Sequence, residues 1–194
     1  LENAPKKGYN VRYLPLLAEQ TIIRIPLSVA EAFREYYAVL LNSIAPNALK
    51  RVFDILIALA GLLVAAPLMA VIGILVSFTS GMPILYRQKR VGLSERPFTI
   101  HKFRTMKNPL DADAAQFADE ADDRITPLGR ILRKTRLDEL PQLWDVLVGN
   151  MSIIGPRPEQ QEFHERFSRD IPFYRDRTRV RPGITGWAQI NFAY

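Results

Sequence analysis

Two adjacent acids, Asp138 and Glu139, are the residues of this sequence best suited to chemistry. They lie between the basic segment RKTR and Pro141, within the stretch RKTRLDELPQLWDVLVGNMSIIGPRP. A carboxylate can attack phosphorus and form an acyl phosphate. One or two carboxylates can also hold a magnesium ion that shares its other ligands with phosphate oxygens. The pair is therefore suited to either of two roles in phosphoryl chemistry, as a nucleophile or as ligands of Mg²⁺.

The apolar spacing around this pair predicts a helix that begins near Asp138. Apolar residues lie at positions 137, 140, 143, 144, 147 and 148, and Pro141 is tolerated in a first turn but not in a helix interior. The pair would then lie at a helix N-terminus, where free N–H groups and the helix dipole favour both carboxylates and phosphate. The alternative is that Asp138 is only an N-cap, a common role for aspartate.

Cationic side chains that suit phosphate binding occur on both sides of the pair. Arg133 would reduce the repulsion between the carboxylates and an approaching phosphate. Arg157 lies between two prolines, and this stiff backbone suits bidentate phosphate binding. Lys102 and Arg104 belong to a basic cluster that we expect to contact lipid headgroups or a phosphate, with a solvated strand face as the alternative. Arginines at 175, 177, 179 and Arg181 would all face one way if that segment were extended.

The segment Val52–Phe78 has the composition of a membrane helix and is longer than the about 20 residues that cross a bilayer. Pro67 lies near its middle, where it removes a helix hydrogen bond, and basic residues flank both ends, which marks both as cytoplasmic. A re-entrant helix, broken at Ala66–Pro67 and with each half about 20 Å long, satisfies both observations. A kinked spanning helix and a buried core helix are the alternatives.

Shorter elements are predicted on either side of this segment. Val29–Ser43 has helical spacing after a Ser28–Glu31 capping box, and the helix would pack on the core or lie on a membrane surface. PILYRQKRVG and FTIHKFRTM alternate as two strands joined by a turn. The acids between Asp111 and Asp123 match no calcium-binding loop, so we expect a solvated helix or loop there.

The composition narrows the classes of partner. The chain has 194 residues, a net charge of +6 and a pI of about 9.7, which favours an anionic partner. Few aromatics accompany the basic residues and no recognisable motif binds nucleic acid, so we expect a membrane surface or a phosphorylated substrate instead. The absence of cysteine excludes disulfides and thiolate metal sites. The chain starts at Leu1 without a signal-peptide pattern, and we expect a fragment of a longer protein.

Several motifs occur in a fixed order, namely KRVFDILIALAGLLVAAPLM, YRQKRVG, FTIHKFRTM, TRLDELPQLWDVLVGNMSIIGPRP and VRPGITGWAQIN. Together they resemble the bacterial sugar transferase family, the monotopic phosphoglycosyl transferases, over about Leu49–Asn191. The resemblance implies an α+β, membrane-associated monotopic domain with an N-terminal re-entrant helix, amphipathic helices and a small strand element. Ala66 stands where the family commonly has a serine, whose hydroxyl could satisfy freed backbone groups.

The resemblance also implies a domain division. Residues 1–48 would form an N-terminal extension or linker with an amphipathic helix, and residues 49–194 a catalytic domain that includes the membrane helix 52–78. Family domains continue beyond GWAQIN with further helices that pack on the membrane face and add an acidic residue near the site. We therefore expect the catalytic domain to be incomplete at its C-terminal end.

The function implied is transfer of a sugar 1-phosphate from a UDP-sugar to undecaprenyl phosphate or another polyprenyl phosphate, with release of UMP. Family members act at the cytoplasmic face of the bacterial inner membrane, require Mg²⁺, and initiate exopolysaccharide, capsule, O-antigen or glycoconjugate synthesis. By resemblance, Asp138 is the nucleophile that forms a covalent phospho-sugar, Glu139 is its partner, and both bind the metal. Arg157 would grip the nucleotide diphosphate, and the substrate-binding set is Arg157, Arg133, Lys102, Arg104 and Arg181.

Two alternative functions stay open at this point. A direct-displacement transferase would use metal-bound carboxylates only to orient its substrates, without a covalent intermediate. A non-catalytic membrane scaffold or a nucleic-acid binder would account for the basic charge alone. A homo-oligomer is compatible with the sequence, and the identity of the sugar depends on a pocket shape that the sequence does not give.

Overall fold

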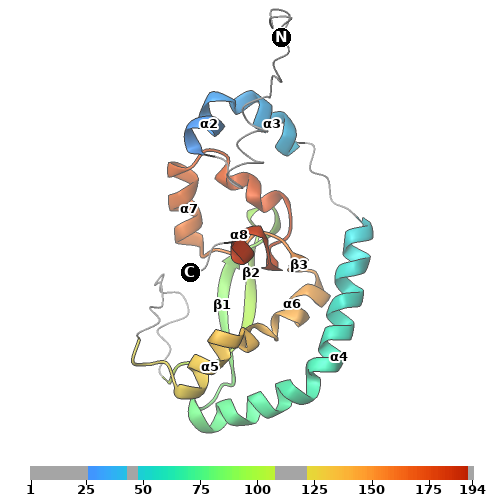
Figure 1. Cartoon of the computed structure of the whole chain (residues 1–194), viewed down its shortest axis with the longest axis vertical. Coiled ribbons are helices and arrows are strands. Elements are labelled where there is room, and N and C mark those ends of the chain that lie inside the picture. The colour runs from blue at the N-terminus through green and yellow to red at the C-terminus, as the bar shows by residue number, and fades with distance from the viewer. Residues whose placement is uncertain (1–25, 43–47, 108–121, 192–194) are drawn as a thin grey trace, which may run out of the picture.

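A computed structural model describes residues 26–42, 48–107 and 122–191 (Figure 1). The predicted acidic segment lies outside these residues except for its last two members, Asp122 and Asp123. The helices are α2 (Leu27–Ala32), α3 (Arg34–Asn42), α4 (Ala48–Thr79), α5 (Pro127–Thr135), α6 (Gln142–Val148), α7 (Gln161–Asp170) and α8 (Trp187–Asn191). The strands are β1 (Leu85–Val91), β2 (Pro97–Phe103), β3 (Ser152–Ile154) and β4 (Gly183–Thr185), and short 3-10 turns are η1 (Leu93–Glu95), η2 (Leu137–Glu139) and η3 (Tyr174–Arg179).

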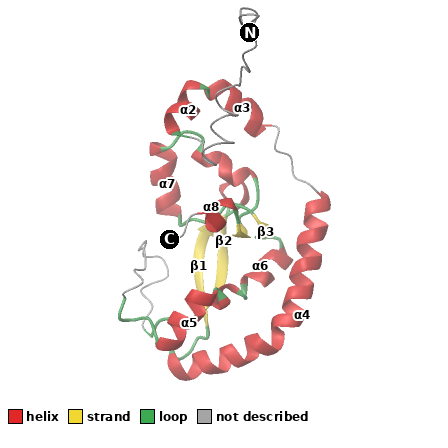
Figure 2. Ribbon diagram, viewed as in Figure 1, coloured by secondary structure: helices red, strands yellow, loops and turns green. Residues whose placement is uncertain are grey.

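Two small sheets lie among these helices, as Figure 2 shows. The predicted strands form the antiparallel hairpin β1–β2, whose register places Tyr86 opposite Lys102 and Arg90 opposite Phe98. The strands β3 and β4 pair in parallel, with Ser152 opposite Gly183. The mixture of helices and small strands confirms the α+β expectation.

The apolar segment forms one long helix, α4, which curves around the rest of the domain (Figure 1). Pro67 lies inside this helix, and the helix continues on both sides of it. Proline lacks one N–H, so the loss of a single internal hydrogen bond can leave the flanking turns intact. The interruption predicted at Ala66–Pro67 is therefore absent from the hydrogen-bonded helix, which bends instead.

The two faces of α4 have different surroundings. Its inner face carries small or buried residues, and a Cβ added at Gly61 would lie 3.2 Å from Leu143 Cδ1, so glycine allows close contact with α6. Its outer face exposes large apolar side chains, including Val64 (79% exposed) and Phe78 (84% exposed). Within the described residues α4 is the helix long and apolar enough to cross a membrane. An apolar surface of this extent is suited to a lipid environment.

Two buried apolar clusters attach α4 to the domain at both ends. The first joins Ala58 of α4 to β2, α6 and the start of β3; the second joins Ile72 and Val76 of α4 to β2 and α5. Their buried members are Ala58, Ile100, Val146 and Met151, and Ile72, Val76, Phe103 and Leu132. The hairpin strand β2 contributes to both clusters, so it is fixed between the two halves of α4.

The N-terminal helix predicted over Val29–Ser43 is wrong in its bounds. The chain forms two helices separated at Phe33, whose φ of −116° and ψ of 35° are not helical. The first begins at Leu27 after Pro26 and has no side-chain cap, so the predicted Ser28–Glu31 capping box does not define its start. Tyr37 is buried, and its ring centroid lies 6.4 Å from that of Phe173, which favours packing on the domain.

The arginine-rich segment is not extended. Tyr174–Arg179 is the 3-10 turn η3, which follows Phe173 with a φ of 60°. Local contacts hold this turn, because Thr178 Oγ1 donates to the Arg175 carbonyl and Arg179 pairs with Asp176. The arginines therefore do not line one face as an extended strand would present them.

Candidate active site

The two acids lie in the short turn η2 between α5 and α6. The helix α5 ends at Thr135, its C-cap Arg136 adopts a left-handed conformation (φ 59°), and the chain then enters η2. The helix predicted to begin near Asp138 begins at Gln142 instead, with Pro141 as its N-cap. The N-cap role of Asp138 is thus wrong, and neither acid makes a side-chain cap. Asp138 and Glu139 are both 8% exposed, which is unusual for carboxylates.

Glu139 lies beside two cations from separate elements. Lys102 Nζ, presented by β2, donates to Glu139 Oε1 at 2.5 Å. Arg157 Nη1, which follows β3, lies 4.0 Å from the same oxygen. The structure therefore brings together four of the predicted site residues, Asp138, Glu139, Lys102 and Arg157, from three parts of the chain.

Backbone contacts fix the loop that carries Arg157. Arg177 Nη2 donates to the Arg157 carbonyl at 2.7 Å, and Arg90 Nη1 donates to the Pro158 carbonyl at 3.2 Å. The backbone N–H of Val91 donates to the carbonyl of Glu159 at 2.9 Å. These contacts, together with the two prolines, hold the Arg157 backbone between β1 and η3.

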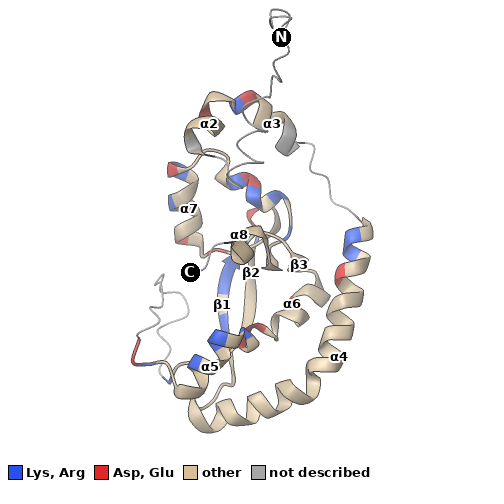
Figure 3. Cartoon of the chain, viewed as in Figure 1, with Lys and Arg blue, Asp and Glu red and all other residues tan. Residues whose placement is uncertain are grey.

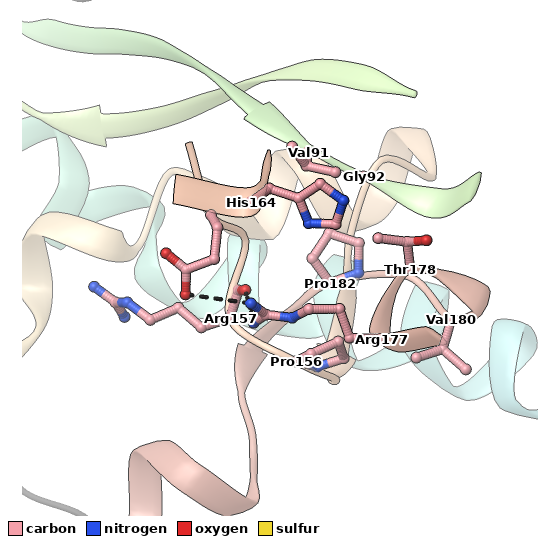
Figure 4. A pocket seen from close by; sticks show the side chains of 10 residues that line it. Val91, Gly92, Pro156, Arg157, His164, Arg177, Thr178, Val180 and Pro182 are labelled. Atoms are coloured by element: carbon pink, nitrogen blue, oxygen red, sulfur yellow. Dashed lines mark hydrogen bonds and ion pairs between the residues drawn. The ribbon is translucent and has the colours of Figure 1, made fainter. Parts of the chain in front are cut away.

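A small pocket borders this loop, and Figure 4 shows Arg157 and Arg177 among the residues that line it. Arg177 Nη1 lies 3.6 Å from Glu159 Oε1. The pocket has a volume of about 10 Å³, room for roughly one water molecule. A nucleotide sugar would not fit inside it. Figure 3 shows basic residues along β1 and α5.

Burial and neighbouring charges shift the pKa values of Asp138, Glu139 and Lys102. Burial raises the pKa of Asp138 above its ordinary value of 3.8, Glu139 adds to the rise, and Lys102 and Arg133 oppose it. Burial alone would also raise the pKa of Glu139, but Lys102 and Arg157 outweigh it and hold that pKa below 4.5. Burial lowers the pKa of Lys102, which Glu139 only partly offsets. The pKa values of the two carboxyl groups are therefore shifted in opposite directions, as expected where the groups have separate roles.

One buried oxygen of the pair is not hydrogen-bonded within the described part of the chain. Asp138 Oδ1 is buried without a hydrogen bond to any described residue, whereas Glu139 Oε1 is bonded to Lys102. Carboxylate oxygens suit Mg²⁺, which commonly takes one or two of them and completes its shell with phosphate oxygens and water. In the described ranges, acidic and imidazole side chains form no cluster of three that could hold a metal alone. The residues fit an ion whose shell a bound diphosphate completes.

The remaining predicted site residues make other contacts. Arg133 Nε donates to Thr105 Oγ1 at 3.0 Å. Arg104 donates from Nε to the Met106 carbonyl at 2.9 Å and from Nη1 to that of Met82 at 2.7 Å. Arg181 Nε donates to the Gly149 carbonyl at 2.9 Å, beyond the C-terminal end of α6. Arg104 and Arg181 thus brace the backbone, and their contact with a substrate stays a prediction.

The sequence interpretation gave no role to a further buried acid, Asp145, and did not pair it with His101. Asp145 is fully buried, and its Oδ1 lies 2.8 Å from His101 Nδ1 while its Oδ2 accepts from the His101 backbone N–H at 3.0 Å. This pair joins α6 to β2 next to Lys102. No signal in the sequence connects the two positions, because the pairing depends on how α6 packs on the hairpin.

The sequence interpretation placed Arg90 in the basic cluster and Arg177 in the arginine-rich segment, but it did not predict that they hold the Arg157 loop. A signal existed for Arg90. Alternation along β1 places it on the same face as Tyr86, which lies opposite Lys102 in the hairpin. No comparable signal marks Arg177, since it lies in an irregular turn.

The fold and the site define a small α+β domain with a membrane-compatible helix and a buried carboxylate pair beside Lys102 and Arg157. The model of the bacterial sugar transferase family matches residues 45–194, and the chain belongs to this family.

Three relatives illustrate this membership. The chain is 46% identical over 158 residues to the UDP-N-acetylgalactosamine-undecaprenyl-phosphate N-acetylgalactosaminephosphotransferase of Aeromonas hydrophila, an alignment covering 79% of this chain and 37% of that protein. The UDP-glucose:undecaprenyl-phosphate glucose-1-phosphate transferase of Escherichia coli (strain K12) is 43% identical over 143 residues, covering 74% and 31%. The protein of the same name from Caulobacter vibrioides is 42% identical over 151 residues, covering 78% and 57%. The chain thus spans between 31% and 57% of the length of these relatives.

Proposed function

We propose that this domain transfers a sugar 1-phosphate from a UDP-sugar to a polyprenyl phosphate such as undecaprenyl phosphate, through a covalent intermediate on Asp138. The observation that carries the proposal is the buried, unpartnered Oδ1 of Asp138 next to the Lys102–Glu139–Arg157 cluster. A buried polar atom without a partner costs free energy, and such atoms are retained where a ligand or a reaction uses them. The names of the relatives supply the substrate class.

The first step joins the nucleophile to phosphorus. A carboxylate oxygen of Asp138 attacks the β-phosphorus of the UDP-sugar, an O–P bond forms, and the diphosphate bridge breaks. UMP leaves with the bridging oxygen, and the sugar 1-phosphate stays on Asp138 as an acyl phosphate. Arg157 binds the diphosphate and stabilises the charge that develops on the leaving group.

The second step regenerates the protein. A phosphate oxygen of the polyprenyl phosphate attacks the same phosphorus, the bond to Asp138 breaks, and the carboxylate is restored. The products are UMP and a polyprenyl diphosphate sugar. Lys102 keeps Glu139 ionised and in place in both steps, because its ammonium group is bonded to the carboxylate.

Asp138 and Glu139 would hold the magnesium ion, which supplies charge neutralisation for the diphosphate when bound. Of this pair, Asp138 offers its unpartnered Oδ1 directly. Glu139 is held by Lys102, so it would act from a fixed orientation.

We propose that the long helix α4 holds this chemistry at a bilayer and that it is re-entrant from the cytoplasmic leaflet of the inner membrane. Both ends of α4 pack on the same small domain, through the clusters around Ala58 and Val76. A helix that crossed the bilayer would carry its two ends to opposite sides. The basic flanks of α4 also favour the cytoplasmic side for both ends.

The experiment that tests the function measures UMP release with a panel of UDP-sugars, with and without undecaprenyl phosphate. The relatives' names differ in the sugar, so the panel includes UDP-glucose and UDP-N-acetylgalactosamine. Transfer with ping-pong kinetics, and phospho-sugar labelling of the protein without the lipid acceptor, supports the covalent route. Ternary-complex kinetics without labelling would favour direct displacement, and no UMP release from any sugar would contradict the proposed activity. The polysaccharide initiated would follow from the sugar that is accepted.

A further inference from the structure

The charged residues of α4 are confined to its first two turns, as Figure 3 shows. They are Lys50, Arg51 and Asp54, and the rest of the helix is apolar or small, with polar groups only at its C-terminal end. Beyond their value as a basic membrane flank, they make specific contacts with the domain. These contacts converge on the turn between α6 and β3.

Asp54 holds the β3 side of that turn. Its side chain is 6% exposed, and its Oδ1 accepts from the Ile153 backbone N–H at 3.0 Å. The Ser152 hydroxyl lies 2.9 Å from its Oδ2, and Lys50 Nζ lies 3.2 Å from the same oxygen. A buried carboxylate is stable only with such partners, so Asp54 and the start of β3 fix each other.

Arg51 holds the α6 side. Its Nη1 donates to the Val146 carbonyl at 2.7 Å and its Nη2 to the Leu147 carbonyl at 2.9 Å. Carbonyls in the last turn of a helix lack helical partners and carry a partial negative charge, which a guanidinium complements. Gly149 continues the turn with a φ of 95°, and a Cβ there would lie 3.3 Å from Arg51 Nη2.

The turn that these residues hold lies within the segment that runs from Glu139 through α6 and β3 to Arg157. The helix α6 is about 10 Å long and β3 about 10 Å, so the turn lies about one such length from each end of this segment. Asn150 N and Met151 N both donate to the Asp145 carbonyl and tighten the turn. Glu139 precedes α6 and Arg157 follows β3, and Arg157 Nη1 lies 4.0 Å from Glu139 Oε1.

We infer that Arg51 and Asp54 are positioning residues for the proposed transfer reaction. By fixing the end of α6 and the start of β3, they set the separation of the Glu139 and Arg157 side chains. They also make that separation depend on the packing of α4, so the site is assembled only when the first half of this helix lies against the domain. The inference rests on the proposed function for the role of Arg157, and it adds the contacts that position Arg157.

A double-mutant cycle tests the inference in the full chain in detergent micelles. The variants are Asp54→Asn, Arg157→Ala and the double variant, and the readouts are the equilibrium affinity for UDP and the KM and kcat of UMP release. We expect Asp54→Asn to weaken UDP binding about ten-fold and to raise KM more than it lowers kcat. The double variant should bind UDP no more weakly than Arg157→Ala alone, because Asp54 acts through Arg157.

Ser152→Ala removes the hydroxyl that contacts Asp54 but leaves the sequence of α4 unchanged. Like Asp54→Asn, it should weaken UDP binding. Its matched control is Ser77→Ala, which removes a hydroxyl that donates to the Ile74 carbonyl of α4 itself. Additive losses in the cycle, or a lower melting temperature with unchanged UDP affinity in both Asp54→Asn and Ser152→Ala, would overturn the inference. A wild-type chain that binds UDP and releases no UMP contradicts the proposed function, and the binding cycle still decides the role of Asp54.

Discussion

Two buried aspartates close in sequence, Asp138 before α6 and Asp145 within it, have opposite relations to their surroundings. Asp145 is fully buried and both of its oxygens are bonded to His101, through the ring and through the backbone N–H. Asp138 is 8% exposed, and its Oδ1 has no partner in the described part of the chain. Burial raises the pKa of both groups. Similar burial thus accompanies one satisfied carboxylate and one unsatisfied carboxylate.

The difference teaches how structural and chemical roles separate in a small domain. A buried carboxylate with complete hydrogen bonding stabilises the packing of the elements that it joins. A buried carboxylate that keeps an unbonded oxygen costs stability and leaves that oxygen available to a metal or to phosphorus. We therefore assign α6–β2 attachment to Asp145 and the proposed reaction to Asp138.

The largest expected effect is on activity and comes from Asp138→Asn. The amide is nearly isosteric but is not a nucleophile, so UMP release should fall by at least about 10³-fold and phospho-sugar labelling should disappear. Because the amide is uncharged, the melting temperature should not fall. Labelled protein in this variant would show that the nucleophile is another residue.

Asp145→Ala should act on stability instead. Removal of the carboxylate leaves the His101 N–H and ring without their partner, and we expect a loss of about 3 kcal/mol in the free energy of unfolding. Asp145→Asn is the matched variant, because its amide oxygen can still accept from the His101 backbone N–H. It should lower the free energy of unfolding by less than Asp145→Ala does. Thermal unfolding in micelles measures both. If Asp145→Asn instead abolished labelling while the fold was retained, the separation of roles would fail.

Lys102→Met should reduce UMP release by about 10²-fold. Methionine keeps the length of the side chain but removes the ammonium group that holds Glu139 Oε1. Without it, burial would dominate and the pKa of Glu139 would rise. Lys89→Met, which removes an exposed lysine of β1, is the control. Equal losses in both variants would indicate a general charge effect on an anionic substrate.

The smallest expected effect is a displacement of the pH profile. Asp138 must be ionised to attack, and its raised pKa places the acid limb of kcat/KM above pH 3.8. For stability the sign is opposite. A raised folded-state pKa means that the folded protein binds the proton more tightly, so the contributions of Asp138 and Asp145 are lost as pH rises through their folded pKa values. The stability contributed by Asp138, measured as the difference in melting temperature between the wild type and Asp138→Asn over this range, should therefore fall as activity rises. A rise of both would contradict the assignment.

Much of the site could be predicted from the sequence, because its residues occur in local motifs. The pair Asp138–Glu139, the arginine between two prolines and the alternating segment that carries Lys102 each have a pattern of their own. The long helix was predicted with nearly its observed bounds, since apolar length and composition are local properties. The start of α6 was misplaced because η2 has the helical spacing of an α-helix without its hydrogen bonds.

The contacts between distant segments could not be predicted in this way. The arginine segment 175–181 alternates as a strand would, but Phe173 begins a turn and local pairing holds η3. The partners of Asp54 and Asp145 lie on other elements, and a single sequence carries no information about which elements meet.

The sequence by itself determined the chemical groups of this protein, the apolar helix and the hairpin, because residue type and short-range periodicity encode them. Only the tertiary structure decided which charges meet and which oxygen stays unbonded. The physical reason is that hydrogen bonds and ion pairs act over a few ångströms. Lys102, Glu139 and Arg157 form one cluster only after β2, α6 and β3 have packed against α4.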